Sequence, residues 1–135
     1  MGRDVMFGKK KNNHNGIPDD LYEFLEEADR LYIRAFETRS IGILKDYFTR
    51  DCCFAISRWI IAEASERYFS DEKFRTTSWE ILSESPSEII LKKECIYKDI
   101  HLTISRQMKV SDDYREQWAI TVTPDEFWVS NVIPI

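Results

Sequence analysis

The segment FRTTSWEI at residues 74–81 decides the fold, because the period of the apolar side chains changes there. Between residues 21 and 36, apolar side chains recur every three or four positions, which is the spacing of one helix face. From residue 77 onward, Trp79 and Ile81 alternate with polar neighbours, which is the spacing of a strand with one buried face. The sequence therefore predicts helices before residue 74 and strands after it.

The first predicted helix is the longest and shows the clearest amphipathic pattern. Asp20 is its expected N-cap, Glu23 occupies the third helical position, and the helix runs through Phe36. Its solvent-facing side is expected to carry these charged residues: Glu23, Glu26, Glu27, Asp29, Arg30 and Arg34.

Two shorter helices are predicted after a break at residues 38–42. Residues 44–48 form the second helix, with its apolar side chains on one side. The third helix, capped by Thr49 or Asp51, continues to residue 64.

Five strands are predicted downstream, joined by short polar turns. The first ends at a turn at residues 84–87, and the others span residues 89–97, 100–110, 114–122 and 127–133. Consecutive strands joined by short turns pair as antiparallel hairpins. The expected fold is α+β, with three N-terminal helices packed on one face of an antiparallel sheet.

One domain is expected over residues 18–135, because a chain of 135 residues fits a single core. Residues 1–17 are expected to be a disordered basic leader, because they hold little that could be buried. Lys9, Lys10 and Lys11 in this leader allow at most a weak peripheral contact with an anionic membrane.

Composition and charge narrow the classes of partner. The net charge of −5 argues against nucleic acid, because the phosphate backbone requires clustered cations. No apolar run approaches the ~20 residues that span a bilayer, and no secretory signal is visible. Cys52, Cys53 and Cys95 have no metal-binding or disulfide spacing and are expected to be small core or half-buried thiols. These features predict a cytoplasmic protein without a metal or another cofactor.

Four segments resemble a known superfamily. The closing segments EQWAIT (116–121) and FWVSNV (127–132) are similar to the ending of the nuclear-transport-factor-2-like (cystatin-like) superfamily. The segments YIRAFE (32–37) and LKDYFT (44–49) most resemble the Tim-forty-four-like domain of the mitochondrial import-motor scaffold and its bacterial relatives. The resemblance covers residues 18–135 and implies a cone-shaped fold, in which three helices lie across a strongly curved sheet and leave a cavity.

The resemblance does not fix the function, because the superfamily includes ligand-binding modules, dimeric adaptors, membrane-proximal scaffolds and a minority of enzymes. Its enzymes place a His–Asp pair or a similar acid/base set in the cavity. In this chain His14 lies in the leader and His101 lies on the polar side of its predicted strand, so no catalytic residue is assigned.

Three charged residues occupy apolar positions of the predicted strands: Lys93, Arg106 and Glu116. A two-residue turn after the second strand would set Lys93 opposite Ile104. The following turn would place Arg106 beside Trp118 and near Glu116. All three charges would then share one sheet face, where desolvation disfavours unpaired ions.

Two interpretations of this face are open. In the first, the strands overhang the helices, and the charges line a rim and pair with one another. In the second, the face lines a pocket in which Arg106 or Lys93 binds an anionic ligand. The candidate ligand-binding residues are Arg106, Lys93, Glu116, Trp79, Tyr97 and Trp118.

The expected function is that of a non-catalytic protein-interaction or ligand-binding module, of which a membrane-proximal scaffold is one form, and the module is expected to form a homodimer through its sheet. Trp128 is expected to contribute to that interface from the outer sheet face. The alternative is a cavity-based enzyme of the cyclase or dehydratase type, or a carrier of an anionic or apolar ligand. The lack of acid/base residues on the inward positions favours the non-catalytic module.

Overall fold

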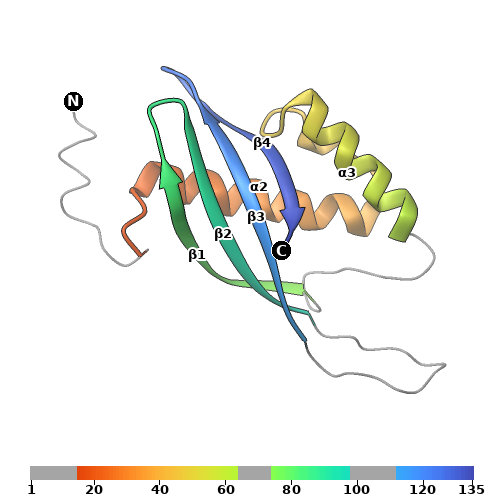
Figure 1. Ribbon diagram of the computed structural model, residues 1–135. Coiled ribbons are helices and arrows are strands. Elements are labelled where there is room, and N and C mark those ends of the chain that lie inside the picture. Colours follow the sequence, from red (N-terminus) through yellow and green to blue (C-terminus); the bar gives the residue numbers. More distant parts are fainter. Residues whose placement is uncertain (1–14, 64–73, 98–111) are drawn as a thin grey trace.

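The computed structural model describes residues 15–63, 74–97 and 112–135 (Figure 1). These residues form two α-helices, one short 3-10 helix and a four-stranded antiparallel sheet, which confirms the predicted α+β class. In chain order the elements are α2 (Asp19–Thr38), η1 (Gly42–Leu44), α3 (Arg50–Glu63), β1 (Phe74–Glu84), β2 (Glu88–Tyr97), β3 (Asp112–Val122) and β4 (Phe127–Pro134).

Helix α2 has the predicted amphipathic pattern but begins before the predicted cap. Pro18 is its N-cap, and the Tyr22 N–H donates to the Pro18 carbonyl at 2.9 Å. Asp20 therefore lies within the first turn, where a negative charge suits the positive end of the helix dipole. The helix ends where Arg39 adopts a left-handed conformation (φ 59°) and donates its N–H to the Ala35 carbonyl.

The predicted second helix is only a 3-10 turn, so the described residues form two α-helices and η1 in place of the three helices expected there. The backbone leaves the helical conformation because residues 47–49 hydrogen-bond to β4. The Val129 N–H donates to the Tyr47 carbonyl at 2.8 Å, and the Thr49 N–H donates to the Val129 carbonyl at 2.9 Å. Thr49 then caps α3, because its Oγ1 accepts a hydrogen bond from the Cys52 N–H at 3.3 Å.

The sheet has the strand order β1-β2-β3-β4, with β3 as the direct neighbour of β2. Lys93 lies between Trp79 on β1 and Glu116 on β3, so its predicted pairing with Ile104 is wrong. The predicted strand at residues 100–110 lies outside the described residues.

Trp118 is also enclosed on both sides within the sheet. Its neighbours are Leu91 on β2 and Val132 on β4, so the predicted place of Arg106 beside Trp118 is wrong. Register shifts interrupt the β1–β2 and β3–β4 ladders, and such bulges bend and twist a sheet.

Figure 1 shows α2 running across one face of the curved sheet, with α3 beside β4. The described core lies between these layers and includes Leu25, Phe48, Leu91, Trp118 and Val129, all at most 1% exposed. The core begins at Ile17, which is only 2% exposed, so the predicted leader is too long at its C-terminal end. The rest of that leader, residues 1–14, lies outside the described residues.

Cys52, Cys53 and Cys95 are buried free thiols, as predicted. Neither α2 nor α3, the two long helices of the described part, is long and apolar enough to cross a membrane.

Candidate functional site

Two of the predicted charged residues meet inside the core. Lys93 Nζ lies 3.1 Å from Glu116 Oε1, and the two residues are 0% and 1% exposed. Their strands pair in register, so the two side chains leave the sheet side by side on the face that α2 covers. The predicted common face of Lys93 and Glu116 is confirmed, but the two residues lie in the core and not at a rim, and they pair with each other although the predicted register set Lys93 opposite Ile104.

A third charged residue, Asp29 of α2, completes this buried group. Its Oδ1 lies 2.5 Å from Lys93 Nζ, and its Oδ2 accepts a hydrogen bond from Thr76 Oγ1 at 2.6 Å. Asp29 is 7% exposed, so its predicted place on the solvent side of the helix is wrong. A usable signal exists in the sequence, because Leu25 and Ile33 lie one turn away on either side and are themselves buried.

Aromatic side chains enclose the ammonium and the carboxylates. Tyr32 OH donates to Glu116 Oε2 at 2.6 Å, and Trp118 Nε1–H donates to Glu116 Oε1 at 2.9 Å. Lys93 Nζ lies 4.6 Å from the ring centroid of Tyr32 and 4.8 Å from that of Trp118, within range of cation–π attraction. We call Asp29, Lys93, Glu116, Tyr32 and Trp118 the buried charge cluster.

The buried charge cluster holds its ions by mutual attraction. Burial by itself would lower the pKa of Lys93, but attraction to Asp29 and Glu116 outweighs it, and the pKa is raised. Burial would likewise raise the pKa of Glu116. Attraction to Lys93 and hydrogen bonds from Trp118 and Tyr32 reverse the direction, and the pKa is lowered. Both groups are therefore charged at neutral pH.

The six candidate ligand-binding residues are thus only partly brought together. Lys93, Glu116, Trp79 and Trp118 lie in one place and are at most 5% exposed. Arg106 lies outside the described residues, as does the side chain of Tyr97, although the Tyr97 backbone pairs with Asp112. Within the described part, the anionic groups around Lys93 come from the protein itself.

The thiols are poorly suited to nucleophilic chemistry. Burial raises the pKa of Cys95 to about 12, and burial together with Cys53 raises the pKa of Cys52 to about 12. Burial also raises the pKa of Cys53. Because the thiolate is the reactive form, these residues are predominantly unreactive thiols at neutral pH.

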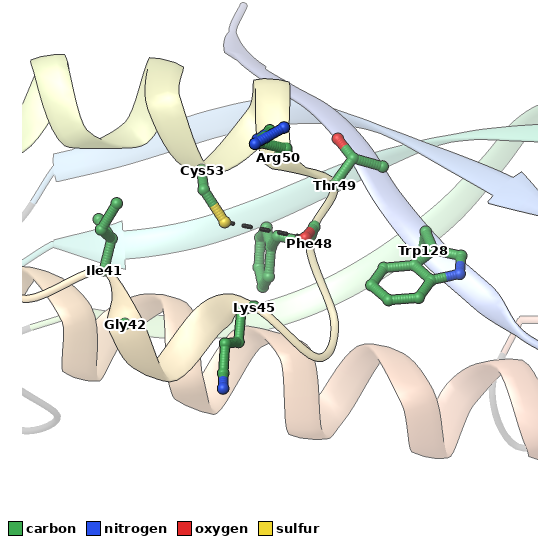
Figure 2. Close-up of a pocket in the computed structure, with 8 residues that line it drawn as sticks. All are labelled: Ile41, Gly42, Lys45, Phe48, Thr49, Arg50, Cys53 and Trp128. Atoms are coloured by element: carbon green, nitrogen blue, oxygen red, sulfur yellow. Dashed lines mark hydrogen bonds between the residues drawn. The ribbon is translucent and has the colours of Figure 1, made fainter.

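An open pocket of about 560 Å³ lies between η1, the start of α3 and β4, and none of its lining residues belongs to the buried charge cluster (Figure 2). We call it the β4 pocket; its lining residues are Ile41, Gly42, Lys45, Phe48, Thr49, Arg50, Cys53 and Trp128. Its volume is in the range of small-molecule sites in proteins.

The walls of the β4 pocket combine apolar surface with two cations. In Figure 2, Phe48 lies centrally, Ile41 and the half-buried Trp128 lie on opposite sides, and Arg50 projects from the first turn of α3. Cys53 Sγ donates to the Phe48 carbonyl at 3.7 Å, which ties α3 to the segment that forms the floor. Lys45 and Arg50 are exposed, and within the part of the chain that the structure describes neither forms an ion pair.

The sequence did not single out the β4 pocket. Trp128 was expected on an exposed interface, but it is half-buried in the pocket wall. Lys45 and Arg50 come from a different part of the chain, and the isolated bridge between Phe48 and Val129 is what brings the two parts together. A lone parallel bridge leaves no pattern in the sequence that could predict it.

A second hollow, of about 490 Å³, lies between α2 and β1 beside Asp29. Its lining includes acidic residues of α2, Glu26 and Glu27, and the basic Arg75 of β1. The Asp29 carboxylate at its inner end is already bound by Lys93 and Thr76. This mixed lining favours no one class of ligand, so the β4 pocket is the better candidate site.

Comparison with known proteins identifies no family for this chain. No model of a protein family, no curated protein and no solved structure matches this chain.

Proposed function

We propose that this protein is a non-catalytic ligand-binding module, and that the β4 pocket receives a small molecule in which an anionic group is attached to an apolar one. The observation that carries the proposal is the pair of exposed cations, Lys45 and Arg50, at an otherwise apolar pocket. A pocket of this size with a few polar groups at its edge is the usual form of a small-molecule site.

The apolar part of the ligand would contact Ile41 and Trp128. Phe48 is 1% exposed and its backbone is bridged to Val129, so its buried side chain closes the floor of the pocket. Trp128 offers a large, stiff surface whose burial by a ligand would be favourable.

The anionic part would lie at the edge of the pocket formed by Arg50. Arg50 is the first residue of α3, where the helix dipole also favours a negative charge. Its forked donors suit a carboxylate, and Lys45 adds a second positive charge on the η1 side.

The pocket lining supports binding without catalysis. Among its eight residues the titratable groups are Lys45, Arg50 and Cys53, with neither a carboxylate nor a histidine. Burial raises the pKa of the Cys53 thiol, which disfavours the nucleophilic thiolate. The acidic groups of the buried charge cluster are enclosed by the core, out of reach of a substrate in this pocket.

The proposal includes membership of the nuclear-transport-factor-2-like superfamily, with its cone-shaped fold. It is supported by the order of helices before strands, by α2 lying across one face of a bent sheet, and by the sequence patterns at residues 32–49 and 116–132. Ligand-binding modules without catalytic residues occur in that superfamily, so the two parts of the proposal agree.

Octanoate and indoleacetate, each compared with its neutral amide, test the proposal. Binding is measured by calorimetry and by shifts of backbone resonances. We expect the two carboxylates to bind and to shift the resonances of residues around Phe48 and Trp128. The Lys45→Gln/Arg50→Gln double variant should bind octanoate about tenfold more weakly, because two favourable charges are lost, and octanamide unchanged.

Arg34→Gln is the matched control, since Arg34 is an exposed cation on α2 that does not line the pocket. It should bind octanoate like the wild type. The proposal is overturned if neither carboxylate binds. It is also overturned if octanoate binds with unchanged affinity both to Trp128→Leu and to the Lys45→Gln/Arg50→Gln double variant.

A further inference from the structure

The outer face of α3 carries large apolar side chains that nothing in the described part of the chain covers. Phe54 is 65% exposed and Ile61 is 72% exposed. They lie two turns apart on the same side of the helix, opposite the side that buries Cys52, Ile56 and Ile60. Exposed side chains of this size on one helix face are typical of a contact surface.

The charges on this face are self-complementary. Asp51 and Arg58 are exposed and two turns apart, with Phe54 and Ala55 between them. Seven residues of helix rise by about 10.5 Å, too far for an ion pair between Asp51 and Arg58 of one chain. Within the described residues, neither side chain forms an ion pair.

We infer that α3 is a self-association surface, on which a second copy of this chain packs its own α3 in antiparallel orientation. A two-fold axis near Phe54 and Ala55 sets each Asp51 opposite the Arg58 of the partner subunit. The two ion pairs are then related by the symmetry, as an isologous dimer requires. The two Phe54 rings meet near the axis, and the small Ala55 allows the helices to approach closely.

A second copy fits this face better than an anionic membrane does. Asp51 lies on the exposed face and would be repelled by anionic lipid, whereas an antiparallel copy pairs it. Arg50 is also exposed on α3, but it lies at the pocket end of the helix and is not needed for the pairing.

On the outer face of the sheet, where a homodimer is predicted, one network of charges is already formed. Lys92 Nζ lies 3.2 Å from a Glu80 oxygen and 3.3 Å from a Glu94 oxygen, and Arg115 Nε lies 3.6 Å from Glu94. These charges are matched within one chain. A helix of 14 residues offers less area than a standard stable interface, so the α3 dimer is expected to be weak and concentration-dependent.

Charge reversal with sedimentation velocity tests the inference. The wild type is run over a concentration series beside Asp51→Arg and Arg58→Asp. Each single variant alone should associate at least about tenfold more weakly, because both ion pairs become like-charge contacts. An equimolar mixture of the two variants should regain association, because each subunit then offers the charges that the other one needs.

Circular dichroism of each variant shows that the helices are intact, and Phe54→Lys should abolish association without altering the spectrum. Ile133→Arg, on the outer sheet face, is the control and should associate like the wild type. The inference is overturned if the wild type is monomeric at the highest concentration, if the mixture fails to associate, or if only Ile133→Arg dissociates the dimer. Binding of octanoate by Arg58→Asp, whose residue does not line the pocket, should be unchanged, so this surface and the β4 pocket are tested separately.

Discussion

Lys93 on β2 and Glu116 on β3 occupy opposite positions of the sheet, and their charged groups meet at 3.1 Å where no solvent reaches them. Asp29 reaches the same ammonium from α2 and so links the helix layer to the sheet layer. A buried ion pair gives little net stability compared with an apolar core, but loss of one partner is costly because the other stays buried and unpaired. The cluster therefore specifies how α2 sits on the sheet more than it stabilises the fold.

Lys93→Met should be strongly destabilising. The methionine fills a similar volume but leaves Glu116 and Asp29 without their cation. We expect the free energy of unfolding to fall by about 3–5 kcal/mol, as measured by urea denaturation.

Lys92→Met is the matched control, because Lys92 is the adjacent residue and its ion pairs with Glu80 and Glu94 are exposed to solvent. It should change the stability little. An equal loss of unfolding free energy in Lys93→Met and Lys92→Met would show that burial of Lys93 has no energetic consequence.

Stability should decline in acid because of Glu116. Its pKa is lower in the folded protein than the value of about 4.3 in an unfolded chain. Its contribution is therefore complete above about pH 5 and is lost as the pH falls through the folded pKa. When Tm is measured as a function of pH, Glu116→Gln should be less stable than the wild type at neutral pH. Its Tm should also fall less steeply as the pH is lowered. A fall of Tm in acid as steep as that of the wild type would contradict the role of Glu116.

Lys93 determines how stability changes at alkaline pH, and here the stability falls as the pH rises. Its pKa is raised above the unfolded value of about 10.4, so its contribution is complete below about pH 10 and is lost as the pH rises through the folded pKa. The wild type should therefore lose stability above pH 10 more steeply than Lys93→Met does. Tm measured in that range for the wild type and Lys93→Met checks this prediction, and equally steep losses in the two proteins would contradict it.

Part of this cluster could be predicted from the sequence, and the missing part has a physical reason. Lys93 and Glu116 each interrupt a run of alternating apolar residues, and strand alternation alone places them on the covered face. Asp29 was misplaced because a charged residue beside Glu27 and Arg30 resembles a solvent-facing helix position. The apolar Leu25 and Ile33, one turn away on either side, were the signal that Asp29 lies on the buried side of the helix, and Lys93 is the buried partner that its carboxylate meets there.

Strand pairing was harder to predict than strand position. The sequence offers a short turn after Tyr97, which suggested that the next apolar run would lie beside β2. In the structure β3 is the neighbour of β2, and Cys95 lies opposite Tyr114. Turn residues decide local hairpins, but the partner of a strand depends on the whole sheet. The β4 pocket could not be predicted for a similar reason, because it depends on the contact of residues 47–49 with Val129.

Tyr32→Phe should isolate the contribution of one hydrogen bond in the cluster. The Tyr32 hydroxyl donates to Glu116 Oε2 at 2.6 Å, and its loss leaves that buried carboxylate oxygen without this donor. We expect a loss of about 1.5–3 kcal/mol in the free energy of unfolding, together with a higher pKa of Glu116. The pKa is measurable by carbon-detected NMR titration of the glutamate carboxyl.

Tyr47→Phe is the control for that variant, since Tyr47 is a half-buried tyrosine that stacks on Phe24 with its centroid at 5.4 Å. It should leave the pKa of Glu116 unchanged. If Tyr32→Phe also left it unchanged, the short hydroxyl contact would have no electrostatic role.

Cys53 should be the first thiol to react with iodoacetamide in the folded protein, and it should react slowly. It borders the β4 pocket, whereas Cys52 and Cys95 do not line it. Burial raises the pKa of all three thiols, so the rate at neutral pH is limited by the small thiolate fraction and should increase as the pH rises. Mass spectrometry of tryptic peptides identifies the modified residue, and Cys53→Ser should remove the first labelling event.

Octanoate in the β4 pocket should slow the labelling of Cys53. It should not slow the labelling of Cys95, which requires unfolding. If Cys95 were labelled first, the pocket would not be the route by which reagents reach the thiols.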